Sequence, residues 1–383
     1  MKRELLKLIE CKKCNCEFNL KVFKNEQEVK DGLLVCPRCK NYYFVVEFIP
    51  RILSKELYKN NLFEKKYEKE IKKNIPEFKL KEEEDKLSEL KKDNIKFFGY
   101  EWVHFNRHGF DDHIYNERFE EKIFHEKTLL KKKEIKNKLV LDAGCGNGRY
   151  TYQAAKCGAK IVGFDLGPGV ESAYQNTKDF PNVHIIQADI FNLPFKKEVF
   201  DVVFTIGVIH HTGNSKKAFQ SVIKPLRKDG TIAVTCYHKG NFLWEFNDWW
   251  IRKITTKMSI PKLIKLSKFL ANSCKFCGLA IEKPVNLLFR WEPNVSIMYD
   301  WYSAPIAHHH NYPEIYSWCK RLGVNVTEDL RWEKRERIRN IKLIREYIAP
   351  DWAITIKGIK QNSHIKKLNP THIWDKTKIN WKS

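Results

Sequence analysis

The sequence predicts an α/β fold built on a largely parallel sheet, and three observations carry this prediction. An apolar run at residues 139–141 breaks into the glycine-rich stretch 144–148, and a helical pattern follows it directly. Further apolar runs of strand length follow along the chain, and acidic residues close two of them. These later runs lie at residues 160–164, 183–187, 200–206 and 231–236.

The glycine-rich stretch predicts a place where a ligand meets the backbone. The turn that leaves the strand is tight, so a β-carbon there would collide with a close ligand. The N–H groups at the start of the next helix face the same ligand. A nicotinamide-dinucleotide fingerprint would need G-x-G-x-x-G, but Gly148 comes one residue early and Arg149 stands in its place. The spacing therefore disfavours a dehydrogenase.

With Asp142 before its first glycine, this stretch resembles motif I of the class I S-adenosylmethionine (SAM) methyltransferases, and residues 138–360 match that family in order. The resemblance, of the methyltransferase type 11 kind, implies a Rossmann-like seven-stranded sheet that ends in an antiparallel hairpin. It also implies that Asp165 holds the ribose hydroxyls and that Asp189 lies beside the adenine. The cofactor-binding residues implied are Asp142, Gly144, Cys145, Gly146, Gly148, Asp165, Leu166, Asp189, Ile190 and Ile206. An α/β domain without a cofactor is the alternative, which five correctly spaced features disfavour.

Four N-terminal cysteines have the spacing of a metal site. Two C-x2-C pairs lie 21 residues apart, and they are Cys11 with Cys14 and Cys36 with Cys39. Four thiolates close a tetrahedral zinc shell, so the predicted Zn2+ is structural. Cys16 is an alternative ligand to Cys14, and unmetallated cysteines are the alternative to zinc. Residues 1–52 resemble the zinc ribbon that precedes some bacterial methyltransferase domains, although Phe48 replaces the glycine of a Gly-Ile-Pro-like turn. If zinc is only structural, its removal should unfold this module alone.

Residues 53–137 divide into two parts of different composition. Lys and Glu at helical spacing dominate residues 53–96, which predicts a charged, solvated helical linker. Residues 97–137 are rich in aromatic side chains. In the family that the chain resembles, the segment before motif I commonly folds over the cofactor, so these residues are predicted to form lid helices. Aromatic residues that simply pack a helix onto the sheet are the alternative.

Residues 239–311 follow the SAM-binding core, 138–238, as a tryptophan-rich insertion that is too long for an ordinary connection. It is predicted to form a helical cap where ligands bind, with Asp300, Trp301, Tyr302 and His308 to His310 meeting the substrate. The apolar face of residues 260–271 is expected either to pack on the core or to lie on an anionic membrane surface. Two further segments complete the chain, the C-terminal part of the sheet at 312–360 and a basic tail at 361–383.

The composition of the chain indicates its cellular compartment and the kinds of partner that it binds. No apolar run is long enough to span a membrane, and the first residues lack the pattern of a signal peptide. Eleven cysteines without a secretion signal suggest reduced thiols, so a cytoplasmic location is predicted. The formal net charge of +23 lies mostly in residues 239–383. This excess fits RNA or an anionic lipid or glycan carrier, or it is a compositional habit of a Lys-rich chain.

The chemistry that the resemblance implies is methyl transfer from SAM to an acceptor held in line with the methyl group. If the acceptor is a hydroxyl, a positioned histidine is the expected base, and the candidates are His210 and His211 after the fourth strand. Packing or cofactor contact is the alternative role for this pair.

The predicted function is a SAM-dependent methyltransferase acting on a small-molecule or glycan hydroxyl, as in surface-polysaccharide biosynthesis. The aromatic insertion is the reason, because it suits a sugar-stacking pocket. One alternative is an RNA (rRNA or tRNA) base methyltransferase, since certain ribosomal-RNA guanine methyltransferases also place a zinc ribbon before this fold. A non-catalytic SAM-binding partner protein is the other alternative.

Overall fold

The computed structural model describes residues 1–54, 57, 61–78, 89–110, 117–240, 242–286, 288–330 and 353–361. Within them, seven strands form the core of one large sheet. Five are mutually parallel, namely β5 (Leu139–Ala143), β6 (Lys160–Asp165), β7 (Val183–Ala188), β8 (Phe200–Ile206) and β9 (Leu226–Tyr237). β11 (Ala353–Lys360) runs antiparallel to β9 and pairs with β10 (Val324–Asp329) as an antiparallel hairpin. The core order β7-β6-β5-β8-β9-β11-β10 confirms the predicted fold class.

Helices cover both faces of the core sheet because side chains along each strand alternate between the two faces. On one face, Leu141 belongs to the core that buries α8 (Ser215–Ile223) and α13 (Tyr312–Arg321). On the other face, Val140 packs with α4 (Glu117–Thr128), α6 (Arg149–Lys156) and α7 (Gly169–Thr177). The short helices η2 (Ile209–His211) and α5 (Lys132–Ile135) lie in the connections.

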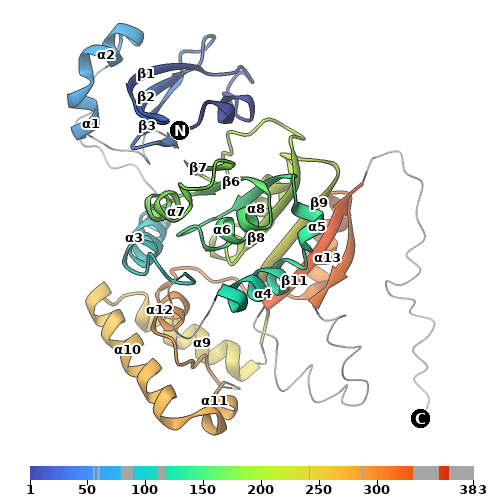
Figure 1. Cartoon of the computed structure of the whole chain (residues 1–383). Coiled ribbons are helices and arrows are strands. Elements are labelled where there is room, and N and C mark those ends of the chain that lie inside the picture. Colours follow the sequence, from blue (N-terminus) through green and yellow to red (C-terminus); the bar gives the residue numbers. More distant parts are fainter. Residues whose placement is uncertain are drawn as a thin grey trace.

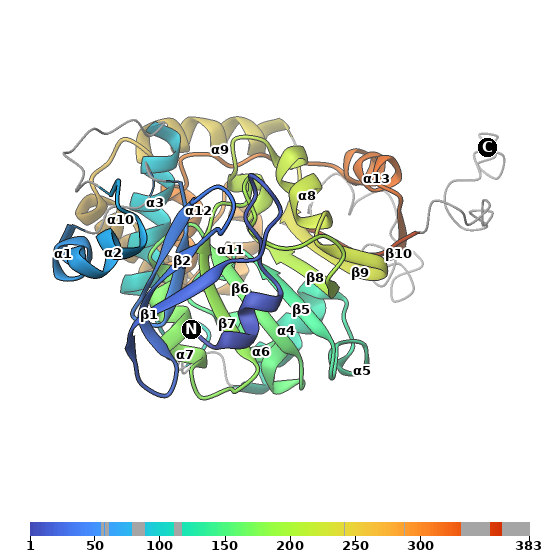
Figure 2. The same ribbon diagram turned by 90° about the horizontal axis from the view of Figure 1, so that it is seen from above.

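The N-terminal module extends the core sheet. It consists of η1 (Arg3–Lys7), β1 (Asn19–Asn25), β2 (Val29–Val35), β3 (Tyr42–Val46) and β4 (Ile49–Ile52). β4 pairs in parallel with β7, with Arg51 opposite Gln187 and Ile52 opposite Ala188. The result is a single eleven-stranded sheet with β1 at one edge and β10 at the other. The module lies beside β7 in Figure 1, and β1 and β10 lie on opposite sides of the molecule in Figure 2. The predicted ribbon is therefore continuous with the cofactor-binding core.

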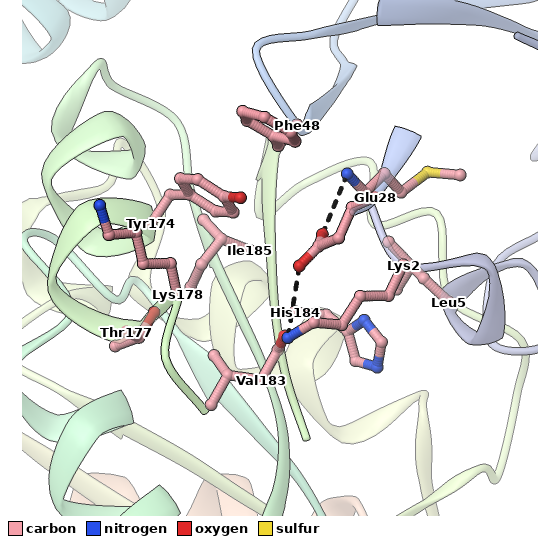
Figure 3. A pocket seen from close by; sticks show the side chains of 11 residues that line it. Lys2, Leu5, Glu28, Phe48, Tyr174, Thr177, Lys178, Val183, His184 and Ile185 are labelled. Carbon is pink, nitrogen blue, oxygen red and sulfur yellow. Dashed lines mark hydrogen bonds and ion pairs between the residues drawn. The ribbon is translucent and has the colours of Figure 1, made fainter. Parts of the chain in front are cut away.

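Figure 3 shows the junction between the module and the core. Glu28 lies 3.2 Å from the amino group of Met1 and 3.6 Å from Nζ of Lys2. Lys2 also donates hydrogen bonds to the backbone carbonyls of Phe180 and Val183, at 2.8 and 2.9 Å. Polar contacts therefore fasten the module to the core beside the strand pairing.

The turn between β3 and β4 explains why phenylalanine stands where glycine was expected. Glu47 and Phe48 both have positive φ, 47° and 70°, the conformation of a tight hairpin turn. A non-glycine residue is strained there. The Phe48 ring stacks on Tyr174 of α7, with ring centroids 5.3 Å apart and planes within 9° of parallel. Aromatic contact with the core offsets the strain of the turn.

The charged-linker prediction is wrong for residues 61–78. The helices α1 (Asn61–Lys66) and α2 (Glu68–Asn74) bury an apolar face against β2 and β3 instead of facing solvent on all sides. The buried apolar residues of this segment are Phe63, Tyr67, Ile71, Ile75 and Phe78. Lys and Glu dominate the composition, so the spaced apolar residues were overlooked. Residues 79–88 of that prediction lie outside the described residues, and α3 (Glu89–His104) follows them.

The insertion after β9 forms four helices, α9 (Phe242–Thr255), α10 (Ile260–Cys277), α11 (Leu279–Val285) and α12 (Val295–Ser303). They lie together at the end of the molecule opposite the N-terminal module (Figure 1). In α10, Leu263, Ser267 and Ala271 are buried. The apolar face of this helix therefore packs inward, which excludes that face from membrane contact. Nearly all of the predicted basic tail lies outside the described residues.

Candidate functional site

A cavity of about 640 Å³ opens where the parallel core strands end at their carboxyl termini. The glycine loop after β5 and the ends of β6, β7 and β8 form one side of it. Residues of α3, α4 and α12 form the other side. This is the position at which open α/β sheets bind ligands. Its volume suits a small-molecule cofactor together with part of an acceptor.

Eight of the ten predicted cofactor-binding residues line this cavity. They are Gly144, Cys145, Gly146, Asp165, Leu166, Asp189, Ile190 and Ile206. They come from four separate strand ends, so the sheet topology alone brings them together.

The Asp165 carboxylate organises the floor of the cavity. Its Oδ2 accepts a hydrogen bond from the Gly146 N–H at 3.0 Å, and its Oδ1 accepts one from the Gly167 N–H at 2.9 Å. Burial raises the pKa of this carboxyl, while the backbone N–H groups lower it. The carboxylate thereby joins the glycine loop to the end of β6. On the next strand, Asp189 accepts a hydrogen bond from the Phe191 N–H at 2.9 Å.

Asp142 and Gly148 do not line the cavity. Asp142 accepts a hydrogen bond from the Thr151 hydroxyl at 2.6 Å, and burial raises the pKa of its carboxyl to about 7. Gly148 has φ of 85°, and a β-carbon on it would lie 2.9 Å from Cα of Ala173 in α7. Both residues contact the helices that follow the loop and not the cavity. They therefore support the shape of the glycine loop without lining the cavity.

The segment before motif I packs over the glycine loop. A β-carbon on Gly146 would lie 2.9 Å from the Trp102 ring of α3. Asn147 donates to the backbone carbonyls of Asn106 and His108, at 3.2 and 2.9 Å. Arg149 forms an ion pair with the buried Glu120 of α4. These contacts cover the cavity with α3 and α4, as a lid would.

Two carboxyl groups face the cavity from the helices that form its second side. Glu101 of α3 is 2% exposed, and burial followed by the charges of Asp300 and Asp165 raises its pKa. Burial also raises the pKa of Asp300 in α12, and its Oδ2 lies 3.4 Å from the Tyr237 hydroxyl, which donates to it. Asp300 was expected near the substrate, but Glu101 and Tyr237 were missed. Only their burial beside the cofactor residues distinguishes them.

The two candidate histidines both line the cavity, but their hydrogen bonds differ. The Tyr237 N–H donates to Nδ1 of His210 at 3.4 Å, so the proton of His210 lies on Nε2. Nδ1 of His211 lies 2.7 Å from the Ile306 carbonyl oxygen, which only accepts, so His211 keeps a lone pair on Nε2. Burial lowers the pKa of His210 well below its ordinary value and that of His211 to about 3. Of the two, His211 has the free acceptor nitrogen that a base requires.

The buried His211 predicts a pH-dependent stability. Its pKa is about 3 in the folded chain and about 6.5 when unfolded, so between these values only the unfolded chain binds the proton. The free energy of unfolding is therefore expected to fall as the pH is lowered from about 6 to 4, by up to about 1.4 kcal/mol per pH unit. Urea unfolding of His211→Asn should show a shallower pH dependence, whereas His104→Asn, at an exposed position, should not. Equal slopes for both variants and the parent would contradict this.

The four predicted zinc ligands converge at one point of the N-terminal module. The sulfur atoms of Cys11, Cys14, Cys36 and Cys39 all lie within 4.8 Å of one another. The Cys14–Cys36 and Cys11–Cys39 distances are 3.2 and 3.5 Å. Ligands on a tetrahedral zinc at about 2.3 Å would lie about 3.8 Å apart, so this cluster fits the ion closely. The Cys16 sulfur instead contacts the Cys14 carbonyl and is not part of the cluster.

Comparison with known proteins identifies the middle of the chain. Residues 134–277 match the family described as a methyltransferase domain. The chain is 32% identical over 105 residues to the tRNA U34 carboxymethyltransferase of Cellvibrio japonicus, a match that covers 26% of this chain and 33% of that protein. It is 28% identical over 131 residues to the tRNA (carboxymethyluridine(34)-5-O)-methyltransferase of Saccharomyces cerevisiae, covering 30% and 46% of the two chains. The chain thus spans less than half the length of these relatives.

Solved structures that are similar to this chain include a putative methyltransferase from Haloferax volcanii in complex with the Trm112 methyltransferase activator. That match has a TM-score of 0.42 and 13% identity, and it covers 72% of this chain and all of the other. Another is magnesium protoporphyrin IX methyltransferase from Synechocystis with bound S-adenosylhomocysteine, at a TM-score of 0.40 and 15% identity, covering 70% and 98%.

The names of the relatives contradict the predicted glycan or small-molecule acceptor. Both relatives are named for uridine 34 of tRNA, which agrees with the RNA alternative. The aromatic insertion had suggested a sugar-stacking pocket. In the structure, Trp244 and Trp291 are instead buried in the core of the cap, and of the insertion's tryptophans only Trp301 lines the cavity among the described residues. Some aromatic residues of the insertion are buried in the cap and others lie on its surface, so the aromatic content does not indicate a sugar-stacking pocket.

Proposed function

We propose that this chain methylates tRNA at uridine 34. It carries a class I SAM-dependent methyltransferase domain and an N-terminal zinc-ribbon module. The observation that carries the proposal is the similarity to curated proteins named for that nucleotide. A net charge of +23 supports a polyanionic substrate, because lysine and arginine side chains replace the counterions of the phosphate backbone. A tRNA substrate also fits the cytoplasmic location predicted from the sequence.

SAM supplies an activated methyl group. The protein therefore has to bind SAM and the acceptor, orient them toward each other and exclude water from the site. In this proposal Asp165 holds the ribose and Asp189 lies near the adenine, as the family resemblance implies. Trp102 and Glu101 close the cavity from α3, and Asp300 closes it from α12. The carboxyls of the buried Glu101 and the half-buried Asp300 suit a cofactor that carries positive charge on both its sulfonium and its amino group.

The role of a base depends on the acceptor atom. The name of the yeast relative specifies an oxygen of carboxymethyluridine. A carboxylate oxygen has no proton to lose, and such an acceptor would need no histidine base. If the acceptor carries a proton, the free Nε2 of His211 is the better-placed base of the pair. A His211→Gln variant that keeps full turnover would support a carboxylate acceptor.

We also propose that the four clustered cysteines hold a structural Zn2+. All four ligand positions would be filled by thiolates, which leaves no position for water or substrate. The ion would stabilise a small module whose own apolar core is limited.

The test of the proposed function is transfer of labelled methyl from SAM to tRNA. Purified protein is incubated with unmodified tRNA transcripts and with cellular tRNA, and digested nucleosides are separated and identified by mass. We expect label in a modified uridine, with none when uridine 34 is replaced by cytidine. Label in another nucleotide would overturn the assignment to uridine 34. If the protein binds SAM but labels no RNA, that result would overturn the proposed tRNA substrate.

A further inference from the structure

The α9 helix of the cap buries several polar side chains together with Trp244, and most of its large apolar side chains are exposed. Asp248, Arg252 and Thr255 are at most 9% exposed. The opposite face carries large apolar residues that are each at least half exposed. They are Phe242, Leu243, Phe246, Trp249, Trp250 and Ile254. Exposed apolar surface of this extent on one helix usually marks a binding surface.

Specific contacts fix this orientation of α9. Nε of Arg252 lies 2.7 Å from Oδ2 of Asp248, and both charges are buried. Oδ1 of the same carboxylate accepts a hydrogen bond from the Trp301 indole at 2.7 Å. Arg252 also reaches the Ala304 carbonyl at 3.4 Å. The hydrogen-bond partners of this buried ion pair lie inside the cap. A rotation of α9 that buried its apolar face would separate Asp248 and Arg252 from these partners, which is energetically costly.

The next helix along the chain, α10, also carries positive charge and exposed apolar groups. The solvent face of α10 carries Phe269, which is 69% exposed, and Phe276, which is 93% exposed. Four exposed lysines share that helix, and they are Lys262, Lys265, Lys268 and Lys275. Residues 249–281 contain seven Lys and Arg side chains and no Asp or Glu. We call the exposed residues of α9 and α10 named here the α9–α10 surface.

The composition of this surface separates three possible occupants. A second copy would bring an equally cationic surface, so like charges would oppose pairing. RNA would satisfy the lysines and stack on the tryptophans, but the aliphatic Leu243 and Ile254 offer it little. A bilayer with anionic headgroups accepts all of these groups, because lysines meet phosphates while Trp, Phe, Leu and Ile enter the boundary of the acyl region.

We propose that the α9–α10 surface binds the face of an anionic membrane. This contact would be peripheral: among the described residues, no helix is both long and apolar enough to cross a bilayer. The predicted membrane contact at residues 260–271 involved the face of α10 that is buried, whereas this surface is the opposite face of the helix together with α9. The inference stands independently of the proposed tRNA substrate.

The test is flotation of the full chain with two kinds of vesicle, one of phosphatidylcholine and one of phosphatidylcholine mixed equally with phosphatidylglycerol. We expect binding to the anionic vesicles only. Replacing the four exposed lysines of α10 by alanine should weaken that binding by about a hundredfold or more. The matched control replaces Lys132, Lys133, Lys136 and Lys228, four exposed lysines elsewhere, and should bind as the parent does.

A second variant tests the apolar contribution. Trp249→Ser with Trp250→Ser should weaken vesicle binding by at least about tenfold, while Leu62→Ser, at an exposed position of α1, should not. Thermal unfolding and SAM binding should match the parent, since these side chains face away from the cap core. Three results would overturn the proposal: no vesicle binding, a concentration-dependent dimer that the tryptophan variant abolishes, or tRNA binding that both α9–α10 variants lose while vesicle binding is unchanged.

Discussion

Replacing Asp165 with alanine is expected to weaken SAM binding by at least about a hundredfold. The family resemblance gives this carboxylate both ribose hydroxyls, and each hydrogen bond to a charged group contributes about 1.5–3 kcal/mol. A loss of 1.4 kcal/mol corresponds to tenfold in affinity. The structure adds a second reason, because the same carboxylate accepts hydrogen bonds from the N–H groups of Gly146 and Gly167. Alanine would leave both donors without their acceptor and release the glycine loop.

Isothermal titration calorimetry with SAM measures this loss, and two variants make it specific. Asp179→Ala removes an exposed carboxylate that follows α7 and should bind SAM as the parent does. Asp165→Asn keeps the size of the side chain and one acceptor, so its affinity should fall between those of the parent and the alanine variant. Unchanged affinity in Asp165→Ala with an intact fold would show that the ribose is held elsewhere.

Loss of zinc is expected to weaken SAM binding by about tenfold or more, although no cysteine of the cluster lines the cavity. The path is short. Arg51 of β4 donates to the side chain of Gln187 at 3.1 Å, and Gln187 donates to the Leu166 carbonyl at 2.9 Å. Leu166 follows Asp165 at the floor of the cavity. A module that unfolds without its metal would therefore release the end of β7 and the loop that holds the cofactor.

Cys36→Ser tests this directly, with metal content and SAM affinity measured on the same preparation. Cys16→Ser is the matched control, because the Cys16 sulfur lies outside the cluster, and it should keep both zinc and SAM affinity. Arg51→Met removes the bridge to Gln187 together with the ion pair to Glu171, and should weaken SAM binding several-fold with zinc retained, whereas Arg38→Met, at an exposed position, should have no effect. Parental SAM affinity in zinc-free protein would show that the module is independent, as the sequence first suggested.

The core sheet and most of the strand-end residues that line the cavity were predictable because both depend on short-range pattern. A buried strand that ends in an acidic or glycine residue appears in sequence as an apolar run with a polar end, and parallel strands bring such ends together. The cluster of four cysteines was predictable for the same reason, since two C-x2-C turns have the spacing of paired ligands.

What could not be predicted depends on contacts between distant segments. The pairing of β4 with β7 involves few residues, and nothing in residues 49–52 specifies that partner. Glu101 and Tyr237 were missed because each becomes a cavity residue only when the lid, the cap and the sheet meet. The α9 face was also hidden, because a helix with apolar residues on one side is ordinarily assumed to turn that side inward.

The pairing between β4 and β7 joins two residues on each strand, which is a small contact for two separate proteins. Here both partners are parts of one chain, so the second is always present at a high effective concentration near the first. An intramolecular contact of this kind needs little intrinsic affinity and is insensitive to dilution. The cofactor site thus keeps its supporting strand even where the protein is scarce, and the ratio of module to catalytic core is always one to one.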